Sequence, residues 1–235
     1  MTRFLPLGFT VLGLIILLGL GTWQLQRLAW KEDLIAQRQA GLAMPPADFP
    51  SDAVDWEDFE FRIVKLSGSF RHDLEQLFGV ETKSGVLGYR VLTPLIRSDG
   101  PAVLVDRGWV PADKADPAAR TEGQPSGAVQ VEGIARYRLN DRPGWFTPEN
   151  DQASRHWYSY DLPAMENALG LDLAPLVVEA DATPNPGGLP VGGRTRVTLT
   201  NNHLQYAITW YGLAAALIGV YIVFRRHQAG ARSPS

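Results

Sequence analysis

A histidine and two aromatic residues stand at helical spacing where a long charge-free stretch of the chain begins. His203, Tyr206 and Trp210 are followed by Ala214 and Leu217. On a helix that turns by about 100° per residue, these side chains fall within about 80° of one another and form one stripe. An imidazole at the end of such a stripe can serve as axial ligand to iron in a flat, mostly apolar macrocycle that lies against the aromatic rings, with Ala214 leaving a gap for it.

Two arginines precede this stripe. Arg194 and Arg196 are placed to pair with carboxylates such as haem propionates at the same membrane edge. Two other interpretations of the stripe stay open. Tyrosine and tryptophan are common at membrane interfaces, where a histidine can simply hydrogen-bond water or lipid headgroups. The stripe can also pack against the first apolar span, where Gly13, Gly19 and Gly21 permit close approach of two helices.

The other three histidines carry weaker signals for chemistry. His72 in an expected turn and His227 in the basic tail are interpreted as solvated surface residues. His156 lies among aromatic residues at an expected strand start, which favours a structural hydrogen-bonding role. The sequence has no hydrolase, zinc-protease, Walker or dinucleotide motif, and it has no cysteine for thiol catalysis, disulfides or thiolate metal sites. We therefore do not expect an enzyme.

Two apolar stretches set the expected organisation. No Asp, Glu, Lys or Arg lies between Arg3 and Arg27 or between Arg196 and Arg225, and about 20 apolar residues suffice to cross a bilayer. The first stretch exceeds the usual apolar core of a signal peptide, which favours an uncleaved anchor. We expect an N-terminal transmembrane helix at 1–25, a periplasmic β-rich domain with an amphipathic helical start at 26–200, a C-terminal transmembrane helix at 203–225 and a basic cytoplasmic tail at 226–235.

The distribution of charge predicts the orientation. The chain has a net charge of −3. Arg3 precedes the first stretch, and Arg225, Arg226 and Arg232 follow the second. Residues 4–224 therefore carry −7. Positive flanks predict that both termini stay in the cytoplasm. An acidic central domain argues against nucleic acid as a partner.

The central segment is rich in strand patterns. The alternation in 59–70 slips by one residue at 63/64, which predicts a β-bulge. A short helix with an Asp161 cap and a terminal Gly170 is expected. Strands that outnumber helices indicate a small antiparallel barrel or sandwich, an α+β domain between the two membrane helices. The strands are expected at 59–70, 85–95, 101–111, 129–137 and 174–180.

Several segments are informative as a set. They are "GTWQLQRLAWKEDLI", "VLVDRGWVP", "FTPEND" followed by "RHWYSYDLPAM", and "PVGGRTRVTLTNNHLQYAITWYGLAAAL". Together and in this order they resemble the Surfeit-locus (Surf/Shy-type) family of cytochrome c oxidase assembly factors. The resemblance implies an inner-membrane protein with two spans that aids maturation of haem–copper terminal oxidases. It also implies that His203 matches the family's proposed haem-ligand histidine and that Trp210 matches its partner tryptophan.

The resemblance extends to cofactor and partners. It implies transient binding of haem a and help with its insertion into the largest oxidase subunit, so the expected partners are that subunit, the haem a synthesis machinery and the lipid bilayer. The first span follows almost at once on the start of the sequence, which favours a bacterial plasma membrane over a mitochondrion. The alternative is a cofactor-free scaffold that stabilises an oxidase subunit, with Trp109, Trp145 and Phe146 as contact points.

Overall fold

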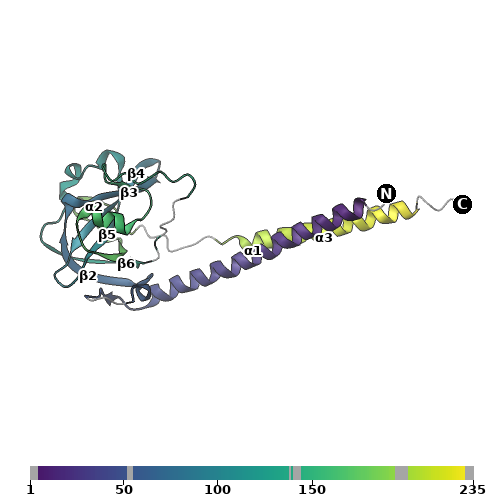
Figure 1. Cartoon of the computed structure of the whole chain (residues 1–235), viewed down its shortest axis with the longest axis horizontal. Coiled ribbons are helices and arrows are strands. Elements are labelled where there is room, and N and C mark those ends of the chain that lie inside the picture. The colour runs from purple at the N-terminus through teal and green to yellow at the C-terminus, as the bar shows by residue number, and fades with distance from the viewer. Residues whose placement is uncertain (1–4, 52–54, 138, 140–143, 194–200, 231–235) are drawn as a thin grey trace. The chain divides into compact units, whose positions relative to one another are not determined.

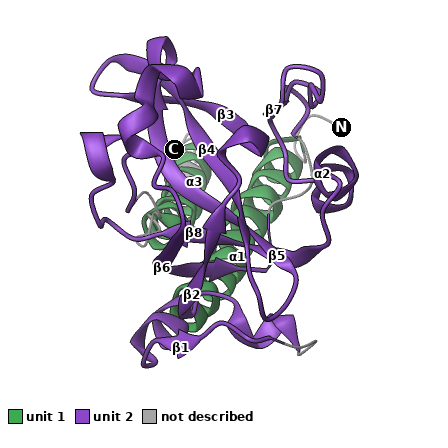
Figure 2. Ribbon diagram, turned by 90° about the vertical axis from the view of Figure 1, so that its left-hand side faces the viewer, with its two compact units in different colours: residues 1–37, 198–235 green, residues 38–197 purple. Residues whose placement is uncertain are grey.

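The computed structural model describes residues 5–51, 55–137, 139, 144–193 and 201–230. The chain divides into two compact units (Figure 2). Unit 1 consists of residues 1–37 and 198–235, and unit 2 of residues 38–197. The two ends of the chain therefore fold together, and the central segment forms a unit of its own.

Unit 1 is built from two long helices. Helix α1 spans Leu5–Ala43 and α3 spans His203–Gly230. Each is long and apolar enough to cross a membrane, and little of its apolar stretch is buried inside the protein. The 39 residues of α1 extend over about 58 Å at 1.5 Å per residue, whereas a bilayer core is about 30 Å thick. The expected helical continuation beyond the first apolar stretch is thus confirmed.

The two helices run antiparallel and side by side (Figure 1). They contact each other closely where glycines of α1 leave room for side chains of α3. A Cβ atom added at Gly13 would lie 3.0 Å from Leu217 Cδ2, and one added at Gly21 would lie 2.9 Å from the ring of Tyr211. Gly19 has no such neighbour within 4 Å. The predicted close approach is confirmed at Gly13 and Gly21, and it is wrong for Gly19, which lies on a different face of α1.

Unit 2 holds all the described strands and one short helix, α2 (Leu162–Leu169). Short 3-10 turns connect several of them. The strands are β1 (Ala47–Asp48), β2 (Ile63–Phe70), β3 (Gln76–Lys83), β4 (Val86–Ile96), β5 (Ala102–Pro111), β6 (Ala128–Arg136), β7 (His156–Trp157) and β8 (Leu173–Ala180).

Five of these strands close into a barrel. Their order is β2, β6, β8, β5, β4 and back to β2. Strand β4 closes the ring because its end pairs with β2 while its first part pairs with β3. The predicted barrel is therefore confirmed over the sandwich. The expectation of an entirely antiparallel sheet is wrong, because β5 and β8 pair in parallel.

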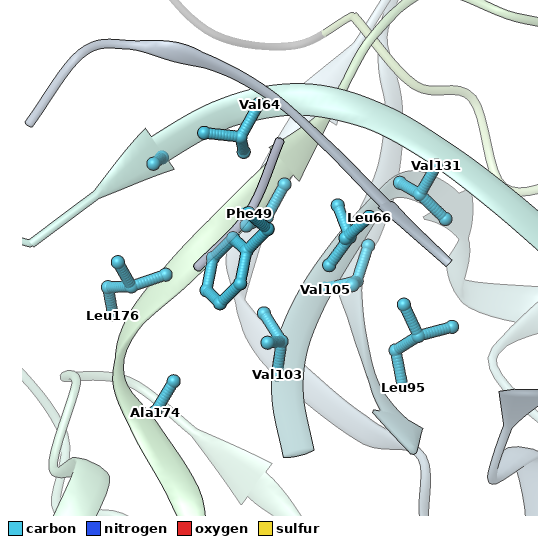
Figure 3. Packing of buried hydrophobic residues seen from close by; sticks show 11 residues of the cluster. Phe49, Val64, Leu66, Leu95, Val103, Val105, Val131, Ala174 and Leu176 are labelled. Atoms are coloured by element: carbon cyan, nitrogen blue, oxygen red, sulfur yellow. The ribbon is translucent and has the colours of Figure 1, made fainter. Parts of the chain in front are cut away.

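Apolar side chains pack on both sides of β5. Val103 and Val105 point into the barrel core, which Figure 3 shows together with Phe49, Val64 and Leu176. The intervening residues of β5 face a second cluster, which α2 covers with Met165 and Leu169 and to which Trp157 also contributes. Burial on both faces explains why residues 102–105 of β5 are a continuous apolar run in the sequence.

Several local predictions are confirmed and others are corrected. Helix α2 begins at the Asp161 cap, whose side chain accepts a hydrogen bond from Ala164 N at 3.0 Å, and it ends at Gly170 with φ 64°. The predicted bulge at 63/64 is wrong, because β2 starts at Ile63 and keeps one register with β6. The apparent slip arises because Phe61 lies before the strand with φ 62°. Strand β3 was not predicted, since its sequence "QLFGVETK" mixes apolar and polar residues without clean alternation.

Candidate functional site

The predicted stripe lies along the edge of the contact between α1 and α3. His203, Trp210 and Leu217 are half-buried, whereas Tyr206 is 54 % exposed on the open side of α3. Ala214 is 3 % exposed, so the gap that the sequence predicted beside it for a macrocycle is filled by α1. Packing against the first span, one of the alternatives, is therefore confirmed for Ala214 and Leu217. Tyr206 remains on the open side, and His203 and Trp210 remain partly exposed.

His203 is held by a residue of the other helix. Its Nδ1 lies 2.7 Å from Oε1 of Gln24. An amide oxygen can only accept a hydrogen bond, so Nδ1 carries the proton and donates it. Nε2 then carries the lone pair, and no residue in the described part of the chain forms a hydrogen bond with it. The arrangement gives His203 the tautomer in which Nε2 can bind a metal.

The histidines of unit 2 have both ring nitrogens engaged. His156 Nε2 donates to Gly79 O at 2.9 Å, and its Nδ1 lies 3.4 Å from the hydroxyl of Tyr158. The expected structural role of His156 is thus confirmed. His72 Nε2 donates to Pro125 O at 3.1 Å, and its Nδ1 lies 3.5 Å from a guanidinium nitrogen of Arg107.

His72 and His227 differ in exposure to solvent. Burial lowers the pKa of His72, an effect that the hydrogen bond to Pro125 opposes and the charge of Arg107 reinforces. The interpretation of His72 as a solvated surface residue is therefore wrong. His227 is exposed in the last turn of α3. Of the histidines, which all lie in the described residues, His203 alone combines one fixed ring nitrogen with one that has no described partner.

A second polar contact joins the two helices close to the first. Thr22 Oγ1 lies 3.1 Å from the hydroxyl of Tyr211, and the Tyr211 ring packs on Gly21. Neither this contact nor the partnership of Gln24 with His203 was predicted. The available signal was the presence of Thr22 and Gln24, two hydrogen-bonding side chains, in the charge-free part of α1.

The structure describes Arg27 of α1 but neither of the two arginines expected beside the stripe. Arg194 and Arg196 lie outside the described residues, so their expected pairing with carboxylates stays a prediction. Arg27 is described, is exposed, and lies with its guanidinium carbon 4.3 Å from the centre of the Trp30 ring. It follows Gln24 by three residues, which places it about one turn further along α1.

The donor set at His203 restricts the kind of metal group that fits. No group of three or more His, Asp or Glu side chains that could hold a metal ion occurs among the residues that the structure describes. A bare zinc ion needs three or four protein ligands, so it does not suit a single imidazole. A haem supplies four ring nitrogens itself and needs only axial ligands from the protein. One imidazole whose Nε2 has no partner among the described residues, beside exposed apolar side chains, therefore suits a haem.

The aromatic residues considered as contact points differ sharply in exposure. Trp109 is buried: its ring packs on Gly88 of β4, and its indole N–H donates to Glu81 O at 3.1 Å. Trp145 is 100 % exposed and Phe146 is 97 % exposed. They follow Gly144, whose N–H donates to Thr147 Oγ1 at 2.8 Å across a turn. Two large aromatic side chains thus stand in solvent on a turn of unit 2.

Buried charges in unit 2 join strands to one another. Arg90 of β4 pairs with Asp106 of β5 and, at 3.4 Å, with Glu179 of β8. Arg136 of β6 lies 3.2 Å from the same Glu179 carboxylate. These ion pairs link four strands of the barrel by complementary charges.

Comparison with known proteins gives consistent results over most of the chain. Residues 11–215 match the model of the SURF1 family. Surfeit locus protein 1 of Mus musculus is 41 % identical over 213 residues, which cover 84 % of this chain and 68 % of that protein. The Homo sapiens protein of the same name is 37 % identical over 228 residues, 90 % of this chain and 74 % of that protein. The SURF1-like protein of Drosophila melanogaster is 36 % identical over 233 residues, 91 % and 76 % of the two chains.

Proposed function

The chain belongs to the SURF1 family, and from this premise we propose that it is a membrane-anchored assembly factor that binds haem a and helps to insert it into the largest subunit of a haem–copper oxidase. A role in oxidase assembly is implied by the family. The proposal goes beyond the family in two points: the bound group is haem a, and His203 is the residue that binds it.

One observation carries the haem part of the proposal. His203 presents a ring nitrogen without a described partner, while its other ring nitrogen is fixed by Gln24 at 2.7 Å. When bound, haem a would supply an iron that takes an axial ligand, and His203 Nε2 would hold it. Trp210 at the edge of the helix contact and the exposed Tyr206 would face the ring, and Arg194 and Arg196 would pair with its propionates.

The exposure of the site suits temporary binding. A group that is delivered to another protein needs a site that also releases it. A single imidazole at the margin of a helix pair leaves much of the macrocycle accessible, whereas two axial ligands buried inside a bundle would enclose it. The open side of α3 at Tyr206 is therefore consistent with transfer.

The two apolar helices support the proposed location. Both are long enough to span a bilayer, and the flanking arginines favour cytoplasmic termini. We propose that the chain lies in a bacterial inner membrane, that both termini are cytoplasmic, and that unit 2 is periplasmic. Haem a is poorly soluble in water, so a site at the end of a membrane helix is a suitable place to receive it from the haem a synthesis machinery.

The proposed function is tested by the haem content of the client oxidase. Cells that lack their own family member would express the wild-type chain, His203→Ala or the control His227→Ala, which removes an exposed histidine from the same helix. We expect His203→Ala to reach the membrane at normal levels and to yield oxidase with less haem a per complex. Full haem a content with His203→Ala would contradict the proposal.

A second candidate function is a cofactor-free scaffold that stabilises an oxidase subunit. The exposure of Trp145 and Phe146 favours it, because large aromatic residues supply much of the binding energy of protein interfaces. The burial of Trp109 removes that residue from the proposed contact. Protein that never carries haem a, purified from cells that make haem a, would favour the scaffold.

A further inference from the structure

We infer that Gln24 is a positioning residue for the iron ligand: its side-chain oxygen holds His203 in the tautomer whose Nε2 can bind haem iron. This inference rests on the proposed function and adds to it a second residue, on the other helix, that determines how well the imidazole binds. Gln24 itself does not contact the iron.

The chemistry of the hydrogen bond supports this role. A neutral imidazole has one N–H and one lone pair, and a metal takes the nitrogen with the lone pair. The 2.7 Å contact from His203 Nδ1 to Gln24 Oε1 keeps the proton on Nδ1. Histidines that bind metals usually donate their other N–H to a nearby oxygen in this way, which fixes the ring and raises the basicity of the ligand nitrogen.

The position of the two residues makes the contact dependent on helix pairing. Gln24 and His203 are 179 residues apart in sequence and come from α1 and α3. Tyr211 aligns the two helices close to this contact. Its ring packs on Gly21, and its hydroxyl lies 3.1 Å from Thr22 Oγ1. The imidazole is therefore oriented only when the two helices are assembled with each other.

An ordinary structural role for the hydrogen bond is the competing explanation. Polar contacts between membrane helices contribute to their association whether or not a cofactor is bound. The Thr22–Tyr211 contact offers a matched control, because it also joins α1 to α3 and lies near the same end of the pair. Tyr211→Phe removes that contact while keeping the ring on Gly21. If hydrogen bonds act only by holding the helices together, Gln24 and Tyr211 variants should behave alike.

The experiment compares full-length protein purified from cells that synthesise haem a. The variants are Gln24→Leu, which removes the acceptor at similar volume, Gln24→Glu, which supplies a stronger acceptor, and Tyr211→Phe. Haem affinity is expected to fall by about 10- to 100-fold in Gln24→Leu, the usual cost of losing the partner of a metal-binding histidine. Tyr211→Phe is expected to keep wild-type affinity.

The reduction potential of the bound haem gives a readout that a structural role would not change. A carboxylate at position 24 makes the imidazole a better electron donor, which stabilises the oxidised iron. Gln24→Glu is therefore expected to retain haem a and to lower its reduction potential relative to wild type. Tyr211→Phe is expected to leave the potential unchanged.

The possible results separate this inference from the proposed function. If His203→Ala loses haem a while both Gln24 variants match wild type in affinity and potential, the function stands and the role of Gln24 is overturned. Equal losses of haem in Gln24→Leu and Tyr211→Phe would also overturn it in favour of helix association. Unchanged haem binding in His203→Ala would contradict the proposed ligand itself.

Discussion

At the scale of single residues, the surroundings of each histidine separate a candidate ligand from structural side chains. His72 and His156 use both ring nitrogens in hydrogen bonds within unit 2. His203 uses one. The sequence predicted His203 from its place before an apolar stretch and predicted the structural role of His156. It gave no means of predicting the partners of the partly buried His72, because Pro125 and Arg107 lie far along the chain.

The burial of His72 predicts a dependence of stability on pH. Burial lowers the pKa of His72 in the folded protein, while the unfolded chain retains a value near 6.5. Below about pH 6.5 the unfolded state therefore binds a proton that the folded state does not, so the free energy of unfolding falls as the pH falls towards the folded pKa. Thermal unfolding of wild type and His72→Gln, measured between about pH 7.5 and 5.5, should show a smaller loss of stability in the variant.

The control for this prediction is His227→Gln, which removes an exposed histidine. It should keep the wild-type dependence on pH. An equal loss of stability on acidification in wild type and His72→Gln would show that His72 does not cause it.

At the scale of secondary structure elements, small residues determine how α1 and α3 meet. Ala207 and Ala214 are almost fully buried on α3, and Gly13 and Gly21 provide space on α1. The two long helices, α2 and most barrel strands could be predicted from the sequence, because apolar runs and capping residues are local signals. Strand β3 could not, because its sequence lacks clean alternation of apolar and polar residues. The parallel β5–β8 pair could not, because its two strands lie far apart in sequence.

The glycines of α1 provide a matched pair of variants for the helix contact. Valine at Gly21 would place new methyl groups against the Tyr211 ring, where an added Cβ already lies 2.9 Å away. Gly21→Val is expected to destabilise the helix pair by about 1–3 kcal/mol, as overpacking usually does. Gly19→Val introduces the same residue where nothing lies within 4 Å. Thermal unfolding in detergent should show a lower midpoint for Gly21→Val than for Gly19→Val, and equal midpoints would contradict this packing.

At the scale of the whole molecule, the two units favour different parts of the proposed function. Unit 1 contains His203 and Gln24, the candidate haem site. Unit 2 is a closed barrel with charges paired across its strands and with Trp145 and Phe146 exposed. The sequence predicted His203, Trp145 and Phe146 as candidates. It did not predict that Gln24 holds the His203 ring, because Gln24 and His203 meet only when α1 and α3 come together.

The central claim is that His203 binds the iron of haem a. The most direct test is the optical absorption spectrum of reduced protein, purified from membranes of cells that synthesise haem a, for wild type, His203→Ala and His227→Ala. A reduced haem a band in wild type and His227→Ala that is lost in His203→Ala is the predicted result. A band of equal strength in all three proteins would contradict the ligand role of His203, and no band in any of them would contradict haem binding and favour the scaffold.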